Sequence, residues 1–223
     1  MALMEKALTR SLPIWEKCKN TRFVQQLLEG TLPEHLFRSY LIQDSIYLSQ
    51  YARAYGKAIY HAQSLAELQL YYSALGFISG TGSEMAVRQD YLARLGLTGR
   101  EIEEIQPLPE NQRYIRFLLE TAERGDRREI LMAILPCMLS YGYIFQGQKG
   151  RAPAQGRMDY RRLIQEYTSE GYGESCREWL DFAGEACGEL PETEEAALAD
   201  IFVQGSLLEL RFWRMFGEER DGE

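Results

Sequence analysis

The sequence predicts an all-α fold, and three features of the chain support this prediction. Apolar residues recur every three or four positions along most of the chain, which is the period of an α-helix. No stretch combines sustained two-residue alternation with many β-branched residues, as a half-buried strand would. The 7 prolines and 19 glycines lie mostly between the periodic segments. We therefore expect roughly eight to ten helices of ordinary length in one domain that spans the whole chain.

The clearest helix start lies at residues 31–34. Thr31 and Glu34 match a capping box, and proline, here Pro33, is tolerated in the first turn of a helix. This helix is predicted to continue to about residue 60. A second helical pattern covers about residues 64–95 and is expected to break near three glycines, Gly76, Gly80 and Gly82.

The second half of the chain contains further helical segments. A short helix should follow Thr98, because Glu101 completes a second capping-box pattern, and Pro107 and Pro109 close this segment. The remaining helices are expected at about 110–124, 126–147, 157–168, 172–187 and 192–217.

The composition limits the possible partners. The chain has 25 basic and 33 acidic residues, a formal net charge of −8, so it lacks the basic surface that nucleic acids and anionic lipids attract. No apolar run reaches the roughly 18 residues of a membrane span, and the N-terminal residues do not resemble a signal peptide. We therefore expect a cytoplasmic protein with no nucleic-acid partner and no membrane partner.

The 4 cysteines and 2 histidines do not suggest a metal site. They form no CxxC pair, and His35 and His61 lack the spacing of metal ligands. Four cysteines in a chain of this length also do not make a disulfide framework. We expect reduced thiols, no metal and no cofactor.

Two acidic residues lie on helical faces that should be buried. Asp44 shares a stripe with Tyr47 and Tyr51, so it is either a functional carboxylate or an acid bonded to a neighbouring tyrosine or arginine. Glu209 lies within the apolar face of the last helix. Because burial tends to raise the pKa of a carboxylic acid, Glu209 is either a proton donor near neutral pH or the partner of a cation on another helix.

A cysteine and four tyrosines form the other unusual group on apolar faces. Cys137 follows Pro136, and the kink that proline causes in a helix could shape a pocket there; alternatively Cys137 is a small buried hydrophobe. The tyrosines could line one cavity for a planar, nitrogen-rich ligand, or they could be core residues scattered around the domain. They are Tyr47, Tyr114, Tyr141 and Tyr167.

Several motifs follow one another in the order found in a known family. They are Phe23-Val24-Gln25 with Gly30-Thr31-Leu32-Pro33, then Gln43-Asp44-Ser45-Ile46-Tyr47-Leu48, then Leu135-Pro136-Cys137 with Tyr141, and finally Glu209-Leu210-Arg211-Phe212-Trp213. From about Trp15 to Phe216 the chain resembles the TenA family, the thiaminase II or aminopyrimidine aminohydrolase family. Cys137 places the resemblance in the cysteine-bearing subgroup.

The resemblance implies a fold like that of haem oxygenase without haem, a homotetramer, and a deep pocket for a 4-aminopyrimidine. It also implies hydrolysis at the methylene attached to the ring. The substrate would be thiamin or its breakdown product 4-amino-5-aminomethyl-2-methylpyrimidine, and the product 4-amino-5-hydroxymethyl-2-methylpyrimidine.

The resemblance further assigns roles to individual residues. Cys137 matches the nucleophile that adds to the ring, and Glu209 matches the acid that protonates a ring nitrogen. Asp44 matches the carboxylate that holds the edge formed by the ring's amino group and the neighbouring nitrogen. The residues that match wall and hydrogen-bonding positions are Tyr47, Tyr114, Tyr141, Tyr167 and Phe212.

The chain departs from the family pattern at three places. Arg22 and Arg88 stand where the family often has histidine, and residues 171–173 lack its usual glycine-rich aromatic pattern. Two other function classes stay open. One is a pyrimidine-binding or regulatory protein without turnover, and the other is an oxygenase or redox enzyme on the same fold.

Overall fold

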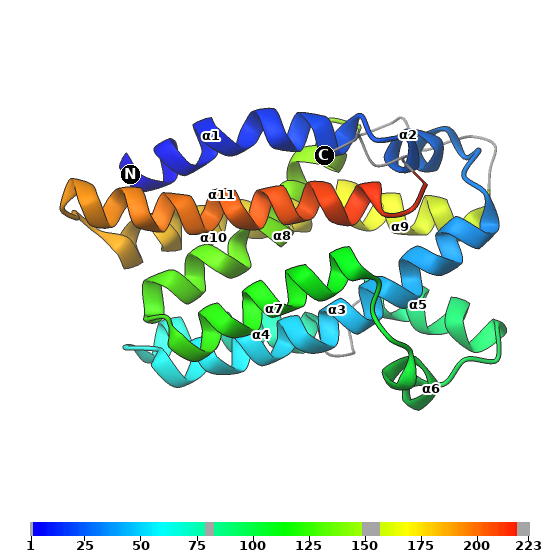
Figure 1. The fold of residues 1–223 in the computed structure, drawn as a ribbon, viewed down its shortest axis with the longest axis horizontal. Coiled ribbons are helices and arrows are strands. Elements are labelled where there is room, and N and C mark those ends of the chain that lie inside the picture. Colours follow the sequence, from blue (N-terminus) through cyan, green and yellow to red (C-terminus); the bar gives the residue numbers. More distant parts are fainter. Residues whose placement is uncertain (1, 79–82, 149–156, 218–223) are drawn as a thin grey trace.

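The computed structural model describes residues 2–78, 83–148 and 157–217, with the backbone alone for residues 2 and 83–87. Within these ranges the chain forms eleven α-helices and no strand, which confirms the all-α prediction (Figure 1). The helices are α1 (Ala2–Lys19), α2 (Arg22–Glu29), α3 (Glu34–His61), α4 (Leu65–Gly76), α5 (Ser83–Arg94), α6 (Gly99–Glu104), α7 (Pro109–Arg124), α8 (Arg127–Gln146), α9 (Met158–Thr168), α10 (Glu170–Cys187) and α11 (Glu192–Arg214).

The predicted segments correspond to helices α3 to α11. The pattern over residues 64–95 is divided as expected, because α4 ends at Gly76 and α5 begins at Ser83; Gly80 and Gly82 lie outside the described residues. The helix count exceeds the expected range, since α1 and α2 precede the first helix start that the sequence analysis identified. The second capping box is confirmed: Thr98 and Glu101 exchange hydrogen bonds at the start of α6.

The capping box predicted at residues 31–34 is wrong. Pro33 is the N-cap of α3, with an extended ψ of 136° and no side-chain cap. Thr31 instead completes the end of α2, where Gly30 adopts a left-handed conformation (φ 76°) and the Thr31 N–H donates to the carbonyl of Gln26 at 2.9 Å. Because the backbone of Thr31 closes one helix, its side chain is not placed to open the next.

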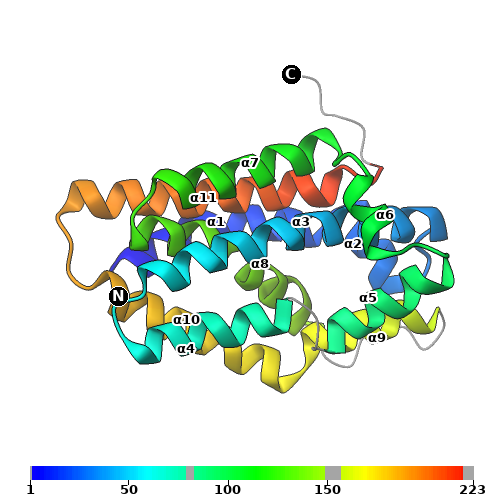
Figure 2. The ribbon, with the colours of Figure 1, turned by 90° about the horizontal axis from the view of Figure 1, so that it is seen from below.

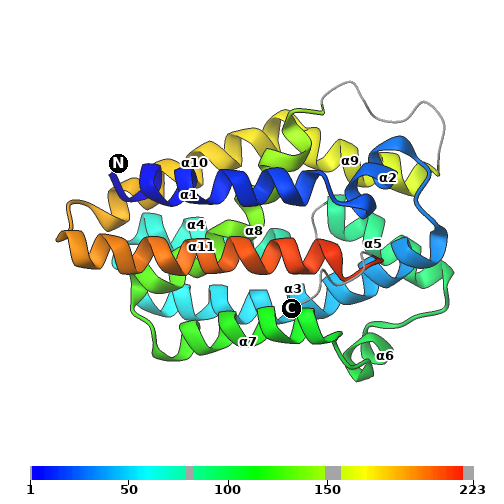
Figure 3. The same ribbon diagram turned by 45° about the horizontal axis from the view of Figure 1, so that its top comes forward.

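Two long helices, α8 and α11, form the centre of the bundle. Figures 1 and 3 show α1 lying along α11, and α11 also packs against α8 and α7. Figure 2 shows α5 beside α9 on another side of the bundle, where these two helices are in contact. By length and composition α8 would pass as a membrane span, but 72% of that stretch is buried inside the protein. Its apolar character is therefore accounted for by its central position.

The two central helices approach each other closely at Gly205. A methyl group at this position of α11 would lie 2.7 Å from Cγ of Pro136 on α8, and 3.7 Å from the carbonyl oxygen of Ala133. Any side chain at position 205 would therefore push the two helices apart, because a proline ring has little freedom to move aside. Glycine at this position and proline opposite it set the distance between α8 and α11.

We predict that Gly205→Ala destabilises the protein. Overpacking against Pro136 should cost about 1–3 kcal/mol, which exceeds the roughly 1 kcal/mol that alanine gains in helix propensity. The control is Gly56→Ala in α3, where an added methyl group has no neighbour within 4 Å and should be stabilising. Urea unfolding of both variants checks this, and an equal gain in stability for the two would contradict the tight crossing.

Candidate active site

A cavity of about 400 Å³ opens between helices α3, α4, α8, α9 and α10. Its wall is mostly aromatic and aliphatic, with a few polar groups, as is usual for small-molecule sites. The side chains that line it include Asp44, Leu48, Tyr51 and Tyr55 of α3, Leu70, Ser73 and Ala74 of α4, Cys137, Met138 and Tyr141 of α8, Tyr167 of α9, and Tyr172, Ser175, Glu178 and Trp179 of α10.

The structure brings the predicted site residues together in two layers. Four of them line the cavity: Asp44, Cys137, Tyr141 and Tyr167. The other four lie in the core, each no more than 2% exposed: Tyr47, Tyr114, Glu209 and Phe212. The second layer is not remote from the first, because Cys137 at the cavity wall lies close enough to Glu209 to affect the pKa of its carboxyl. The tyrosines are therefore neither all cavity walls nor scattered through the domain.

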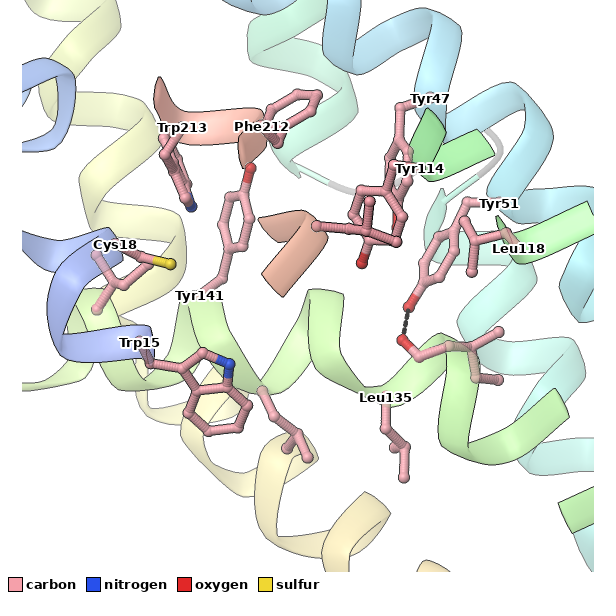
Figure 4. Packing of buried hydrophobic residues seen from close by; sticks show 14 of the residues in the cluster. Trp15, Cys18, Tyr47, Tyr51, Tyr114, Leu118, Leu135, Tyr141, Phe212 and Trp213 are labelled. Carbon is pink, nitrogen blue, oxygen red and sulfur yellow. Dashed lines mark hydrogen bonds between the residues drawn. The ribbon is translucent and has the colours of Figure 1, made fainter. Parts of the chain in front are cut away.

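Cys137 lies on α8 directly after the helix-interior proline, Pro136. It is half-buried and borders the cavity. The hydroxyl of Tyr51 on α3 donates to the carbonyl oxygen of Ile134 at 2.7 Å, three residues before Cys137 (dashed line in Figure 4). This hydrogen bond fixes the proline-containing segment of α8 to α3, and thereby fixes where the thiol faces the cavity.

Glu209 on α11 lies behind the thiol. The hydroxyl of Tyr114 donates to its Oε1 at 2.7 Å. Burial raises the pKa of Glu209 to about 8, and the negative charge of Asp44 adds to this, while the hydrogen bond from Tyr114 and the nearby side chains of Cys137 and Ser140 lower it. None of the ion pairs among the described residues includes Glu209. One interpretation of the sequence expected a cation on another helix as its partner, and the structure has the Tyr114 hydroxyl in that place. The carboxyl can therefore hold a proton at neutral pH.

Aromatic rings surround this carboxyl. The ring of Tyr47 lies 4.7 Å from that of Tyr114 and 6.0 Å from that of Phe212, measured between centroids. Figure 4 shows Tyr47 and Tyr114 beside Tyr51. Burial raises the pKa of both Tyr47 and Tyr114 well above the usual value of tyrosine. Their hydroxyls therefore stay protonated, and Tyr114 remains a donor to Glu209.

Two tyrosines give the cavity an aromatic wall near its polar end. Tyr141 and Tyr167 lie 4.8 Å apart between ring centroids, and the Tyr141 hydroxyl is 3.3 Å from that of Tyr40. Tyr172 packs edge-on against Tyr167, and its hydroxyl donates to the carbonyl of Met138 at 3.0 Å. Such walls suit a planar ring of small size.

Asp44 has an arginine partner. The guanidinium of Arg88 on α5 forms an ion pair with its carboxylate, and the side chains of Arg88 and Asp44 are only 3% and 7% exposed. The structure thus selects the arginine among the partners that the sequence left open for Asp44. This arginine is one of the positions where the chain departs from the family pattern; the side chain of Glu84, which precedes it by one turn, is outside the described residues.

The sequence analysis missed the wall that α4 and α10 contribute. Leu70, Ser73 and Trp179 line the cavity, yet their spacing is that of ordinary helix positions and carried no signal. The sequence analysis noted Arg88 only as a departure from the family pattern. Its position on an otherwise apolar helix face was the signal that could have identified it as a buried cation. In the part of the chain that the structure describes, no three His, Cys, Asp or Glu side chains gather into a metal-binding group.

The raised pKa of Glu209 predicts how its replacement changes stability with pH. The folded protein keeps this proton up to about pH 8, whereas an ordinary glutamate loses it near pH 4.5. Between these values the folded state binds more protons, so this group makes the free energy of unfolding fall as pH rises. We expect Glu209→Gln to remove that effect, so that its stability relative to wild type increases by about 1.4 kcal/mol per pH unit over part of this window.

Urea unfolding at several pH values from 5 to about 8.5 measures this difference. The matched control is Glu174→Gln on α10, an exposed glutamate, which should follow the wild type at every pH. Parallel pH profiles for Glu209→Gln and the wild-type protein would show that Glu209 ionises normally.

Comparison with known proteins identifies the family of this chain. Residues 8–219 match the TENA/THI-4/PQQC family. A protein of Halalkalibacterium halodurans named aminopyrimidine aminohydrolase is 32% identical over 98% of this chain and 95% of its own. The solved structure of a TenA homologue from P. horikoshii OT3 has a TM-score of 0.84 at 28% identity, covering 96% of this chain and 97% of that one.

A more distant structure bears on the fold alone. A domain of unknown function from Shewanella denitrificans, described as having a haem oxygenase-like fold, superposes with a TM-score of 0.67 at 16% identity, over 93% of this chain and 89% of that one. The expected likeness to haem oxygenase is thus confirmed for the fold. On the match over residues 8–219 and the relative at 32% identity, the chain belongs to the TENA/THI-4/PQQC family.

Proposed function

We propose that the protein is an aminopyrimidine hydrolase of thiamin salvage. It converts 4-amino-5-aminomethyl-2-methylpyrimidine, or thiamin, to 4-amino-5-hydroxymethyl-2-methylpyrimidine. The observation that carries the proposal is the pairing of Cys137 at the cavity wall with Glu209 behind it, a carboxyl whose pKa is raised to about 8. A thiol next to a protonated acid, beside an aromatic cavity for a flat ring, is what addition to an aminopyrimidine requires. The name of the Halalkalibacterium halodurans relative supports the same chemistry.

The reaction follows from these positions. An aminopyrimidine is a poor electrophile until a ring nitrogen is protonated. Glu209 gives its proton to the ring and takes up the proton of the Cys137 thiol as the sulfur bonds to a ring carbon. The adduct expels ammonia from the methylene, water adds to the methylene carbon, and the carbon–sulfur bond breaks to release the hydroxymethyl product. Asp44 holds the edge of the ring that carries the amino group, and Tyr141 and Tyr167 flank its face.

A protein that binds pyrimidines without turnover is the second candidate. It would share the cavity, but it would need neither the thiol nor a carboxyl held protonated beside it. Incubating the purified protein with the aminomethylpyrimidine, and measuring ammonia and hydroxymethylpyrimidine together, separates the two. Equal amounts of both products support the hydrolase, whereas bound but unchanged substrate supports the binding protein.

Replacing the nucleophile should abolish turnover without abolishing binding. We expect Cys137→Ser to lower kcat by on the order of 10³-fold or more, because the hydroxyl is a far weaker nucleophile, while the product still binds. Stopped assays and calorimetry measure the two effects. Turnover at the wild-type rate in this variant would remove Cys137 from the mechanism.

Thiol labelling gives an independent check of the same residue. Bound hydroxymethylpyrimidine should protect Cys137 from iodoacetamide. Cys176 is the internal control, since it is half-buried, does not line the cavity, and burial raises its pKa to about 12. Cys18 and Cys187 are almost completely buried and should stay unlabelled in either state. Equal labelling of Cys137 with and without the pyrimidine would argue against binding next to the thiol.

Glu209→Gln should mainly lower kcat. The amide still accepts the hydrogen bond of Tyr114 but cannot supply the proton, so we expect a loss of about 10²-fold in kcat with a KM near that of wild type. The control is Glu174→Gln, which lies on the exposed face of α10. A rise in KM with unchanged kcat would mean that Glu209 serves binding and not proton transfer.

We also propose that the chain assembles as a homotetramer in the cytoplasm, where its four cysteines, none of which forms a disulfide, stay as thiols. An exposed apolar stripe on α4 supports assembly: Leu65, Leu68 and Tyr72 are 70%, 39% and 67% exposed, and Tyr60 nearby is 82% exposed. Further copies of the chain are the expected occupants of this face, since closed symmetric assemblies are the common form of soluble oligomers.

Light scattering should therefore give a mass near four chains of 25.8 kDa each. Because a charge in the α4 stripe opposes burial, we expect Leu65→Glu combined with Tyr72→Glu to shift the mass toward smaller species. Ala66→Glu is the control, because Ala66 is exposed on the same helix but points away from the stripe, and it should leave the mass unchanged. A monomeric wild-type protein would contradict the assembly.

A further inference from the structure

The cavity is longer than the ring that the proposed function places in it. The residues of α3 that border it run from Asp44 to Tyr55, which lies 11 residues later (55 − 44). At a rise of 1.5 Å per residue this is about 16 Å along the helix. A single six-membered ring held by Asp44 covers only part of that length, so the cavity has a far end, near Tyr55, that the ring does not fill.

The far end combines aromatic rings with an acid. Tyr55 of α3 and Trp179 of α10 border the cavity there, and their rings meet nearly at right angles with centroids 5.9 Å apart. Glu178, next to Trp179 in α10, borders the cavity as well and is exposed to solvent. Aromatic side chains and a carboxylate both attract organic cations, so this end of the cavity suits a positively charged group.

The thiol lies between the two ends of the cavity. Tyr51 stands between Asp44 and Tyr55 on α3 and borders the cavity too. Its hydroxyl donates to the carbonyl of Ile134 at 2.7 Å, which brings the Cys137 segment of α8 against the middle of this stretch. Burial raises the pKa of Tyr55, and the nearby Cys137 thiol adds to the rise. The space beyond the thiol is therefore where a group attached to the ring's methylene can extend.

The charges around the far end are mainly negative. Within the described part of the chain, no lysine or arginine borders the cavity. A neighbouring groove shares Glu178 with the cavity and adds Asp181 and Glu185 of α10. Arg127 also borders that groove, but it forms an ion pair with Glu67 at 2.7 Å. A positive group at the far end thus meets net negative charge.

We propose that the far end of the cavity is a subsite for a positively charged leaving group, and that Glu178 is the residue that selects it. The inference rests on the proposed function and adds a substrate preference to it, for pyrimidines whose methylene carries an organic cation large enough to reach Glu178. The thiazolium ring of thiamin is such a cation. The ammonium group of the aminomethylpyrimidine lies too close to the pyrimidine ring to reach Glu178, so this substrate does not use the subsite.

The positive charge of such a leaving group disappears in the reaction. When the bond between the methylene and the thiazolium nitrogen breaks, its electron pair stays on the nitrogen, and the thiazole leaves as a neutral molecule. Water supplies the hydroxyl group of the product, and its other proton is released, so atoms and charge balance. Glu178 therefore attracts the bound substrate but not the departing thiazole, which has no ionic contact to break.

Two substrates that differ in charge test the subsite. Thiamin is compared with 4-amino-5-phenoxymethyl-2-methylpyrimidine, whose leaving group is also a single ring but carries no charge in the substrate. We expect Glu178→Gln to raise the ratio of the KM for thiamin to the KM for the phenoxymethyl compound about fivefold. The kcat for thiamin should stay near that of wild type, because the lost attraction acts on the bound substrate. Glu178→Lys should raise the ratio further.

Ionic strength gives a second readout, which a structural defect would not change in this way. Raising it from about 0.02 M to about 0.5 M should increase the KM of the wild-type protein for thiamin, because salt screens the attraction between exposed charges. The increase should be smaller in Glu178→Gln. The matched control is Glu174→Gln, one turn earlier on α10, which is exposed and does not border the cavity. It should keep the KM ratio and the salt dependence of wild type.

Three outcomes decide between the possibilities. An unchanged KM ratio in both Glu178→Gln and Glu178→Lys would overturn the subsite, and urea unfolding confirms that these exposed-site variants are folded. A wild-type protein that releases ammonia from the aminomethylpyrimidine but does not hydrolyse thiamin would overturn the subsite and leave the proposed function in place. A wild-type protein that hydrolyses none of the three compounds would overturn the proposed function, and this inference with it.

Discussion

The contact between Pro136 of α8 and Gly205 of α11 determines the geometry of the whole site. A methyl group at position 205 would lie 2.7 Å from the proline ring, so a larger residue there would push the two central helices apart. Cys137 is the next residue after the proline, and Glu209 lies about one turn after the glycine. The same contact that joins the two halves of the core therefore places the thiol beside the carboxyl.

The two acids of the site have opposite surroundings. Glu209 accepts a hydrogen bond from the Tyr114 hydroxyl, lies in the core, and has a pKa raised to about 8. Asp44 lies against the Arg88 guanidinium at the edge of the cavity. One residue type thus supplies a group that holds a proton at neutral pH and a group paired with a positive charge, which is a common way for one site to obtain both an acid and an anchor.

Aromatic residues give the cavity its shape at two levels. Tyr141 and Tyr167 form part of the wall itself, whereas Tyr47, Tyr114 and Phe212 pack behind it and enclose the Glu209 carboxyl. Hydrogen bonds from tyrosine hydroxyls tie separate helices together at these points, as from Tyr51 to the carbonyl of Ile134. The rigidity of the site therefore comes from the same side chains that fill the core.

The sequence by itself determined the fold class, most helix boundaries and the identity of the unusual polar residues. Helical periodicity is a local property, and so is the capping box at Thr98 and Glu101; an acid or a cysteine on an apolar stripe is also visible without a structure. The failure at Thr31 was local too, because the end of one helix and the start of the next competed for the same residues.

Only the tertiary structure decided which of these residues meet. Glu209 is 72 residues from Cys137 in the sequence (209 − 137) and 95 from Tyr114, and Arg88 is 44 from Asp44. No periodicity relates such positions, since their distance depends on how the helices cross. The structure also decided that Glu209 is paired with a tyrosine and Asp44 with an arginine, because a partner for a buried charge is chosen by packing in three dimensions and not by neighbours along the chain.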